Sequence, residues 1–224
     1  MAQGSAEEQP NSPVVIELFS SQSCSACITA AEYFQELALR DDIVALGWHV
    51  DYWNLLNTRQ GRWEDPYSRK EHTDRQKKYN INIRKRSSVY TPQMVVDGSF
   101  EAVGSSREKV SALISNAQTN HTTSIIEARK EKNGDIFFIV GRSRSGGNAY
   151  FVTFQRSIET EIKGGENAGV DFIDANVVTN VKRLGVVQRA GAKIIAEPPA
   201  VGKGCALLIQ EPGQRRIIAA SYCP

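Results

Sequence analysis

The chain has 224 residues, of which 41% are hydrophobic and 23% charged, and its formal net charge is +2. This length suits one large domain or two small ones, and the apolar content allows a sizeable core. The weak charge excludes the strongly basic surface of a typical nucleic-acid binder, and no apolar run approaches the ~18 residues of a membrane span. The sequence therefore predicts a globular protein without a nucleic-acid partner and without a membrane span.

The first 12 residues, MAQGSAEEQPNS, are polar, and we expect them to be disordered. They contain no apolar stretch of the kind that a signal peptide requires. This segment is either the natural start of a cytosolic protein or a start that replaces a removed signal peptide.

The region after this segment alternates between strand and helix patterns. Residues 13–21, PVVIELFSS, are apolar and rich in β-branched side chains, as in a buried strand. From Cys24 the apolar spacing becomes helical until about Arg40, and residues 43–53, IVALGWHVDYW, predict a second buried strand. Strand, helix and strand in succession indicate a parallel βαβ unit.

Residues 54–86 are polar and charged, and they predict a helical insertion whose main helix begins near Pro66 and ends near Tyr79. Residues 89–104, VYTPQMVVDGSFEAVG, predict two strands joined by an Asp-Gly turn. Residues 105–119 then show the capping serines and apolar spacing of a helix.

After Asn120 the pattern changes to short strand-like runs separated by Gly, Pro and Asn turns. The expected fold is therefore an α/β domain over residues 13–120, followed by a smaller antiparallel β domain over residues 121–224. The chain as a whole is expected to be α+β.

Cys24 and Cys27 lie between the first predicted strand and the first predicted helix. Cys27 falls on the apolar face of the helix, whereas Cys24 is expected nearer solvent, where the helix dipole favours a thiolate. This arrangement predicts a redox dithiol in which Cys24 attacks and Cys27 resolves mixed disulfides. Other roles stay open: a zinc pair, Cu(I) held with a histidine, a structural disulfide, or a hydrolase that uses Cys24 and His49.

Three polar positions in the predicted strands stand out beside the dithiol. Glu17 is either functional or an ordinary structural or solvent-facing residue, because Glu is rarely buried without a partner or a role. Alternation places His49 and Asp51 on one face of the second strand. These two side chains and Trp53 either form a structural network or surround the dithiol, since ligands of open α/β sheets bind at the carboxyl ends of strands.

The remaining histidines and motifs add no further site. His72 and His121 lie in polar segments and are expected to be solvated. The sequence contains no Gly-rich phosphate loop, no G-x-S-x-G elbow and no zinc-protease motif. We therefore expect no cofactor and no resident metal.

The other two cysteines predict a structural disulfide. Cys205 opens one strand-like run, Cys223 closes the next, and residue 214, midway between them, lies in the turn EPGQRR. Facing residues of an antiparallel hairpin have Cα atoms about 4.5–5.5 Å apart, within disulfide reach. A Cys205–Cys223 disulfide predicts a periplasmic or secreted protein whose signal peptide this sequence lacks, whereas two buried free thiols would fit a cytosolic protein.

Several motifs resemble known proteins. The first strand, the segment Cys24-Ser25-Ala26-Cys27 and VYTPQMVVDG resemble the thioredoxin-like superfamily, in which a cis-proline begins a strand and faces the dithiol. Thr91-Pro92 matches that position and would align a partner's backbone. By position, Glu17 resembles the buried acid that relays the proton of the second cysteine.

More narrowly, ELFSSQSCSAC, HVDYWN, VYTPQMVVDG, ENAG and NVV resemble the bacterial family DUF1223, usually secreted and without an established function. The resemblance implies a thioredoxin-like fold for residues 13–120 and thiol–disulfide exchange with a protein partner. It also leaves open a non-catalytic binding protein or a copper-handling protein. Unlike thioredoxin, the chain has Ser23 before the first cysteine and Ser25-Ala26 between the two, so the direction of exchange stays open.

Overall fold

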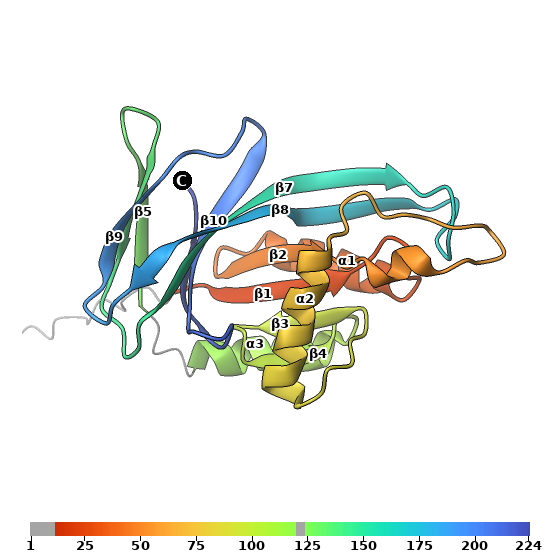
Figure 1. Cartoon of the computed structure of the whole chain (residues 1–224), viewed down its shortest axis with the longest axis horizontal. Helices are drawn as coiled ribbons and strands as arrows, with labels where there is room; N and C mark the ends of the chain where they lie inside the picture. Colours follow the sequence, from red (N-terminus) through yellow and green to blue (C-terminus); the bar gives the residue numbers. More distant parts are fainter. Residues whose placement is uncertain (1–11, 120–123) are drawn as a thin grey trace, which may run out of the picture.

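The structure, a computed structural model, describes residues 12–119 and 124–224. Its strands form an eight-stranded mixed sheet with the order β11-β10-β7-β8-β2-β1-β3-β4 and a three-stranded antiparallel sheet with the order β5-β6-β9 (Figure 1). The expected disordered segment lies outside the described residues except for Ser12. Ser12 is buried, and its Oγ accepts a hydrogen bond of 3.2 Å from the backbone N–H of Ala220.

The elements follow one another along the chain with these bounds. The strands are β1 (Val14–Ser20), β2 (Ile43–His49), β3 (Gln93–Val96), β4 (Phe100–Val103), β5 (Ile126–Lys130), β6 (Ile136–Val140), β7 (Gly147–Glu161), β8 (Asp171–Val187), β9 (Ala192–Ala196), β10 (Lys203–Gln210) and β11 (Ile217–Tyr222). The helices are α1 (Cys27–Ala38), the 3-10 helix η1 (Tyr52–Leu55), α2 (Lys70–Tyr79), the π-helix η2 (Asn80–Arg84) and α3 (Arg107–Thr119).

One face of the β1–β3 part of the large sheet is covered by α1 and α3. Alternate residues of β1 point to this face, and they pack against the apolar stripes of the two helices. The buried members include Ile16, Leu18, Phe34, Leu37, Val110 and Ile114. β1 and β2 pair in parallel over their whole length, as the strand–helix–strand pattern predicts.

The other face of β1–β3 is covered by strands from the second half of the chain. Val15, Phe19 and Trp48 pack there against residues of β7, β8, β10 and β11. The large sheet therefore curls over itself, and β11 comes back to the β3–β4 turn, where the backbone N–H of Ile217 donates to the carbonyl of Asp97 at 2.8 Å. This core joins the first strand of the chain to the last.

β7 and β8 form a long antiparallel ribbon, with strands of 15 and 17 residues. One end of the ribbon packs, with β10 and β11, against the three-stranded sheet. β8 joins β2 through a bridge between Gly47 and Val177, so that strands from before and after residue 120 share one sheet. The other end carries the β7–β8 turn, residues 162–170, toward the start of α1.

Candidate functional site

Cys24 and Cys27 form a disulfide at the start of α1, with their Cα atoms 5.3 Å apart. Cys27 is the first residue of the helix, and the backbone N–H of Cys24 donates to the carbonyl of Ser21 at 3.1 Å. Cys24 is 1% exposed and Cys27 is 0% exposed. The expectation that Cys24 lies nearer solvent is therefore wrong for this oxidised state.

The β7–β8 turn is hydrogen-bonded to the loop that carries the disulfide. The side-chain amide of Asn167 donates to the carbonyls of Gln22 at 2.8 Å and Cys24 at 3.1 Å. The Glu166 carboxylate accepts hydrogen bonds from the backbone N–H of Ser25 at 3.1 Å and from its hydroxyl at 2.7 Å. These contacts hold a segment from a distant part of the sequence against the loop that carries the cysteine pair, in which Ser25 and Ala26, between the cysteines, are exposed.

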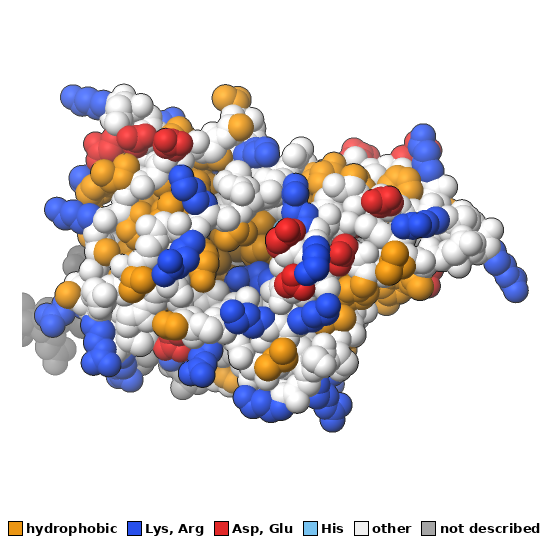
Figure 2. All heavy atoms as spheres, viewed as in Figure 1, with side chains coloured by type: hydrophobic (Ala, Val, Ile, Leu, Met, Phe, Trp, Pro, Cys, Tyr) orange, Lys and Arg blue, Asp and Glu red, His pale blue; other side chains and the backbone are white. Residues whose placement is uncertain are grey.

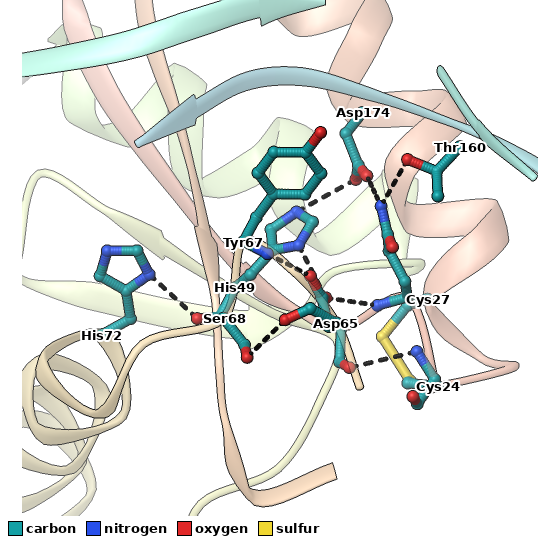
Figure 3. A network of polar contacts seen from close by, with 12 residues as sticks. Cys24, Cys27, His49, Asp65, Tyr67, Ser68, His72, Thr160 and Asp174 are labelled. Carbon is teal, nitrogen blue, oxygen red and sulfur yellow. Dashed lines mark hydrogen bonds and ion pairs between the residues drawn. A yellow bond between two sulfur atoms is a disulfide. The ribbon is translucent and has the colours of Figure 1, made fainter. Parts of the chain in front are cut away.

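A buried polar network supports the loop that leads to Cys24 (Figure 3). His49, the last residue of β2, lies between two carboxylates, with Nδ1 2.8 Å from Asp65 and Nε2 3.2 Å from Asp174. Both carboxylates also bind Gln22: Asp65 accepts from its backbone N–H at 2.9 Å, and Asp174 from its side-chain amide at 3.0 Å. Gln22 precedes Cys24 by two residues, so the network fixes the backbone beside the disulfide.

Opposite charges determine the protonation of this network. Burial by itself would lower the pKa of His49, but the carboxylates of Asp65 and Asp174 outweigh it and hold that pKa well above its ordinary value. Burial would likewise raise the pKa of Asp65, but His49 and the backbone N–H groups of Gln22 and Tyr67 lower it. An imidazolium held by carboxylates is therefore the stable state at neutral pH.

The structure separates Asp51 from His49. β2 ends at His49, and Asp51 follows it in a turn where it accepts a hydrogen bond of 2.5 Å from the hydroxyl of Thr73. The strand alternation that predicts a shared face does not extend to residue 51. Trp53 lies in η1, and its indole N–H donates to the hydroxyl of Thr91 at 2.7 Å.

The Thr91–Pro92 peptide bond is cis, and it immediately precedes β3. The segment lies close to α1 by way of Gly104, whose backbone N–H donates to the carbonyl of Pro92 at 2.9 Å. A Cβ atom on Gly104 would lie 3.2 Å from Pro92 and 3.3 Å from Ala30, so a side chain at this position would crowd both residues. Pro92 therefore lies near the first turns of α1, whereas the side chain of Trp53, which is bonded to Thr91, packs against the core on the other face of the sheet.

Glu17 is fully buried on the face of β1 opposite α1. Arg75 donates to its carboxylate at 2.6 Å, and the hydroxyl of Tyr79 also donates to it. Both partners belong to α2, whereas the neighbouring residues Ile16 and Leu18 point to the core under α1. The structure thus brings Glu17 into a buried ion pair with α2 and not to the cysteine pair.

The prediction that His72 is solvated is wrong. His72 is 3% exposed, and its Nδ1 lies 2.9 Å from the carbonyl of His49. It belongs to a stripe of α2 that also buries Thr73, Gln76 and Tyr79, a helical spacing that the charged composition of this helix conceals. Burial lowers the pKa of His72 to about 4. His121 lies outside the described residues.

The polar residues that sequence reasoning missed are Gln22, Asp65, Asn167 and Asp174. All of them are buried and hydrogen-bonded around the cysteine pair. Asn167 belongs to ENAG, one of the motifs that carry the resemblance to DUF1223, which is the available signal for it. Nothing in the local pattern of Asp65 distinguishes it from the other acidic residues of its polar segment.

A hollow of about 520 Å³ beside α2 lies on another part of the surface (Figure 2). Its lining residues come from β2, α2, β8 and the β10–β11 turn, and the cysteine pair is not among them. Trp48 borders it, and the indole N–H of Trp48 has no hydrogen-bond partner among the described residues. The chemistry that the cysteine pair offers is therefore separate from this hollow.

Within residues 12–119 and 124–224, no group of three or more His, Cys, Asp or Glu side chains is placed to hold a metal ion. None of the helices in the same residues has the length and apolar character needed to cross a membrane.

A second disulfide joins Cys205 to Cys223, with their Cα atoms 5.4 Å apart. The cysteines face each other across the β10–β11 hairpin, where the backbone N–H of Cys223 donates to the carbonyl of Cys205 at 2.9 Å. The pairing of Ala206 with Tyr222 sets this register, and the residues from Glu211 to Arg216 form the turn.

The fold and this site define a mixed α/β protein with a buried disulfide at the start of its first helix. Residues 15–210 match the family model described as "Protein of unknown function (DUF1223)", and the chain belongs to that family. Comparison with curated proteins finds no match.

Two solved structures are similar. Protein AGR_C_4864 from Agrobacterium tumefaciens is 24% identical, with a TM-score of 0.82 over 96% of this chain and 95% of that one. HBP35 of Porphyromonas gingivalis is 11% identical, with a TM-score of 0.64 over 95% of this chain and 74% of that one. At these identities the likeness shows the fold alone.

Proposed function

We propose that the protein carries out thiol–disulfide exchange with a protein partner through Cys24 and Cys27, and that its first half is thioredoxin-like. The observation that carries the proposal is the position of the disulfide, which lies in the loop between β1 and α1 and ends at the first residue of α1. The positive end of the helix dipole favours a thiolate at this place.

The exchange proceeds through a mixed disulfide. The thiolate of Cys24 attacks one sulfur of a partner disulfide, and the other partner sulfur leaves as a thiolate with the bonding electron pair. The thiolate of Cys27 then attacks the Sγ of Cys24 and displaces the partner's remaining thiolate. Two electrons have passed to the partner, whose thiolates take protons from solvent, and the cysteines are left as the disulfide seen in the structure. The reverse sequence oxidises a partner dithiol.

The neighbouring residues have supporting roles in this proposal. Thr91 and Pro92 align the partner's backbone, a role that the sequence resemblance assigns to them, and Trp53 holds Thr91 by its hydrogen bond. His49 and Asp65 act as positioning residues, because they fix Gln22 and with it the loop that carries Cys24.

We also propose that the protein works in an oxidising compartment such as the periplasm or the extracellular space. What supports this is that all the cysteines are paired in two disulfides, one of them remote from the proposed site. Disulfides persist mainly in such compartments.

The test is exchange with a reduced and an oxidised model protein. Cys24→Ser should abolish exchange, and Cys27→Ser should accumulate mixed disulfides because the resolving thiol is gone. Alkylation of the reduced protein should label Cys24 first, with a midpoint below the ~8.5 of a free thiol. The matched control, Cys205→Ala with Cys223→Ala, should retain exchange once its folding has been verified by circular dichroism.

The second candidate is a binding protein in which the Cys24–Cys27 disulfide is only structural. The observation that favours it is the burial of both cysteines in a loop that Asn167 and Glu166 hold by hydrogen bonds. A wild-type protein that exchanges with neither model protein nor small disulfides would overturn the exchange proposal in favour of this one.

A further inference from the structure

A groove runs along α1 beside the cysteine pair. It is lined by Ile28, Ala31, Glu32 and Gln35 of the helix and by Val170–Ile173 of the facing segment, and its volume is about 210 Å³. Ile28 follows Cys27 directly, so the groove begins next to the disulfide. Its second wall begins at Val170, the last residue of the β7–β8 turn.

The floor of this groove is apolar. Ala31 and Phe172 are buried in a small cluster with Ile162, and Ile28 packs against that cluster while remaining partly exposed. Ile173 is 45% exposed and lines the groove, so it adds an accessible apolar side chain to it. An apolar side chain of a partner would gain burial here at a rate of roughly 25 cal/mol per Å².

The rim of the groove is acidic. Glu32 and Asp171 line it, and neither forms an ion pair with another residue in the described part of the chain. Glu161 stands directly opposite Asp171 in the β7–β8 ribbon, and Glu159 stands opposite Ile173. All these carboxylates belong to exposed residues.

The acidity is local, because the whole chain has a net charge of +2. α1 contains two glutamates and no basic residue, and one of them, Glu36, is paired with Arg107 of α3 at 2.6 Å, so that Glu32 supplies the negative charge of the helix at the groove. In the β7–β8 turn, Lys163 forms an exposed pair of 3.6 Å with Glu161 and offsets only part of the negative charge. A concentrated negative field at an apolar groove attracts a segment of the opposite charge and guides its approach.

We propose that this groove docks the protein partner of the Cys24–Cys27 pair, and that the docked segment places Lys or Arg side chains beside an apolar side chain. This inference rests on the proposed exchange function and deepens it by naming the chemistry of the partner. The charges set the approach of the partner, and the apolar floor holds one of its side chains. Docking occurs beside Asn167 and Glu166, the residues that must move before a partner sulfur reaches Cys24.

The first experiment measures binding without chemistry, using two fluorescent peptides that lack cysteine. One peptide has leucine flanked by lysines, and the other has leucine flanked by glutamates. The oxidised wild type should bind the lysine peptide, with an affinity that falls as salt rises, and should bind the glutamate peptide at least about tenfold more weakly. Equal binding of both peptides, or no binding of either, would overturn the proposal.

The variants place the binding in the groove. Glu32→Lys with Asp171→Lys should weaken binding of the lysine peptide about tenfold or more. The matched control, Glu127→Lys with Glu197→Lys, makes the same change in net charge at exposed positions of the three-stranded-sheet region and should leave binding unchanged. Ile173→Ser should weaken binding without changing its salt dependence. If both charge variants lose binding equally, the effect is one of total charge and the proposal fails.

A separate measurement distinguishes this proposal from the exchange function itself. Hydroxyethyl disulfide is small and neutral, so the reduced wild type and both charge variants should react with it at similar rates if exchange occurs. If the protein reacts with this probe but shows no preference for the lysine peptide, the exchange function is supported and the docking proposal is wrong. Preferential binding with no reaction toward any disulfide would support the groove and remove the exchange function.

Discussion

The two disulfides of this protein are placed in different surroundings. Cys24–Cys27 is held among polar side chains that come from distant parts of the chain, including Gln22, Asp65 and Asn167. Cys205–Cys223 joins two neighbouring strands and lies in an apolar cluster under the three-stranded sheet. Directional hydrogen bonds can be removed one at a time, whereas apolar packing is spread over many contacts. The polar surroundings of Cys24–Cys27 therefore suit a bond that must become accessible, and the apolar surroundings of Cys205–Cys223 suit a permanent link.

The largest expected effect comes from breaking the polar network. Asp65→Ala leaves His49 with one carboxylate and removes the acceptor of the Gln22 and Tyr67 backbone N–H groups. Because a buried charge loses its partner, the free energy of unfolding should fall by about 3–5 kcal/mol in urea denaturation. Asp74→Ala, which breaks the exposed pair with Lys70, is the control and should leave the denaturation midpoint unchanged. Similar losses in the two variants would mean that the buried network has no special role.

The two disulfides should contribute differently to stability. Under oxidising conditions, Cys205→Ala with Cys223→Ala should lower the free energy of unfolding by about 3 kcal/mol, and Cys24→Ala with Cys27→Ala by about 2 kcal/mol. The Cys205–Cys223 bond closes the longer loop, because its cysteines are separated by 18 in the sequence, whereas Cys24 and Cys27 are separated by 3. Thermal and urea unfolding of both variants measure the difference. A reversed order would show that native-state contacts of the Cys24–Cys27 bond outweigh loop closure.

The pH dependence of stability should arise in part from the buried polar network of His49 and Asp65. The pKa of His49 is raised in the folded state, so its contribution is complete below the ordinary pKa of histidine and is lost as pH rises toward the higher folded value. The pKa of Asp65 is lowered, so its contribution is lost as pH falls through the acidic range. Above about pH 6.5, stability should fall with pH by at most ~1.4 kcal/mol per unit for one proton.

His49→Gln keeps a hydrogen-bonding side chain at this position and should flatten the alkaline part of this profile, measured by urea denaturation from neutral to alkaline pH. The His72→Gln variant is the control, because burial lowers the pKa of His72 to about 4 and this side chain does not titrate in the alkaline range. An alkaline slope that survives His49→Gln would assign it to other groups.

The smallest expected effect concerns the access of a reductant to the Cys24–Cys27 disulfide. Asn167→Ala removes hydrogen bonds to the carbonyls of Gln22 and Cys24, which should favour the open turn by about 1 kcal/mol. Reduction of Cys24–Cys27 by a phosphine should then be about fivefold faster, since 1.4 kcal/mol corresponds to a factor of ten. Reduction of Cys205–Cys223, followed by peptide mapping, should not change. Equal acceleration of both bonds would indicate general loosening of the protein.

The local parts of the fold could be predicted from the sequence because their signals are local. The run at 13–21 and the helical spacing after Cys24 correspond to β1 and α1, and the Asp-Gly turn corresponds to the β3–β4 hairpin. β8 was missed, although it links the two halves of the large sheet. Its sequence, DFIDANVVTNVKRLGVV, mixes polar and apolar residues because much of the strand is exposed. Only its pairing with β7 makes it a strand.

The candidate site could be predicted in part. The spacing of Cys24 and Cys27 locates the disulfide, but the partners of His49 lie far away in sequence. Local alternation pairs His49 with Asp51, whereas the structure brings in Asp65 and Asp174 from the insertion and from β8. The contact of the β7–β8 turn with the cysteine loop likewise depends on where that turn ends in space, which no local pattern specifies.

The core that joins the first strand to the last has a consequence for how the protein matures. The hydroxyl of Tyr222 in β11 donates to the carbonyl of Ala45 in β2, across a separation of 177 residues. At a synthesis rate of roughly 5–20 residues per second, β11 leaves the ribosome about 10 to 35 s after β2. During that interval the apolar face of β1–β2 lacks the part of its cover that β11 supplies, so the nascent chain cannot complete this core until β11 has been synthesised.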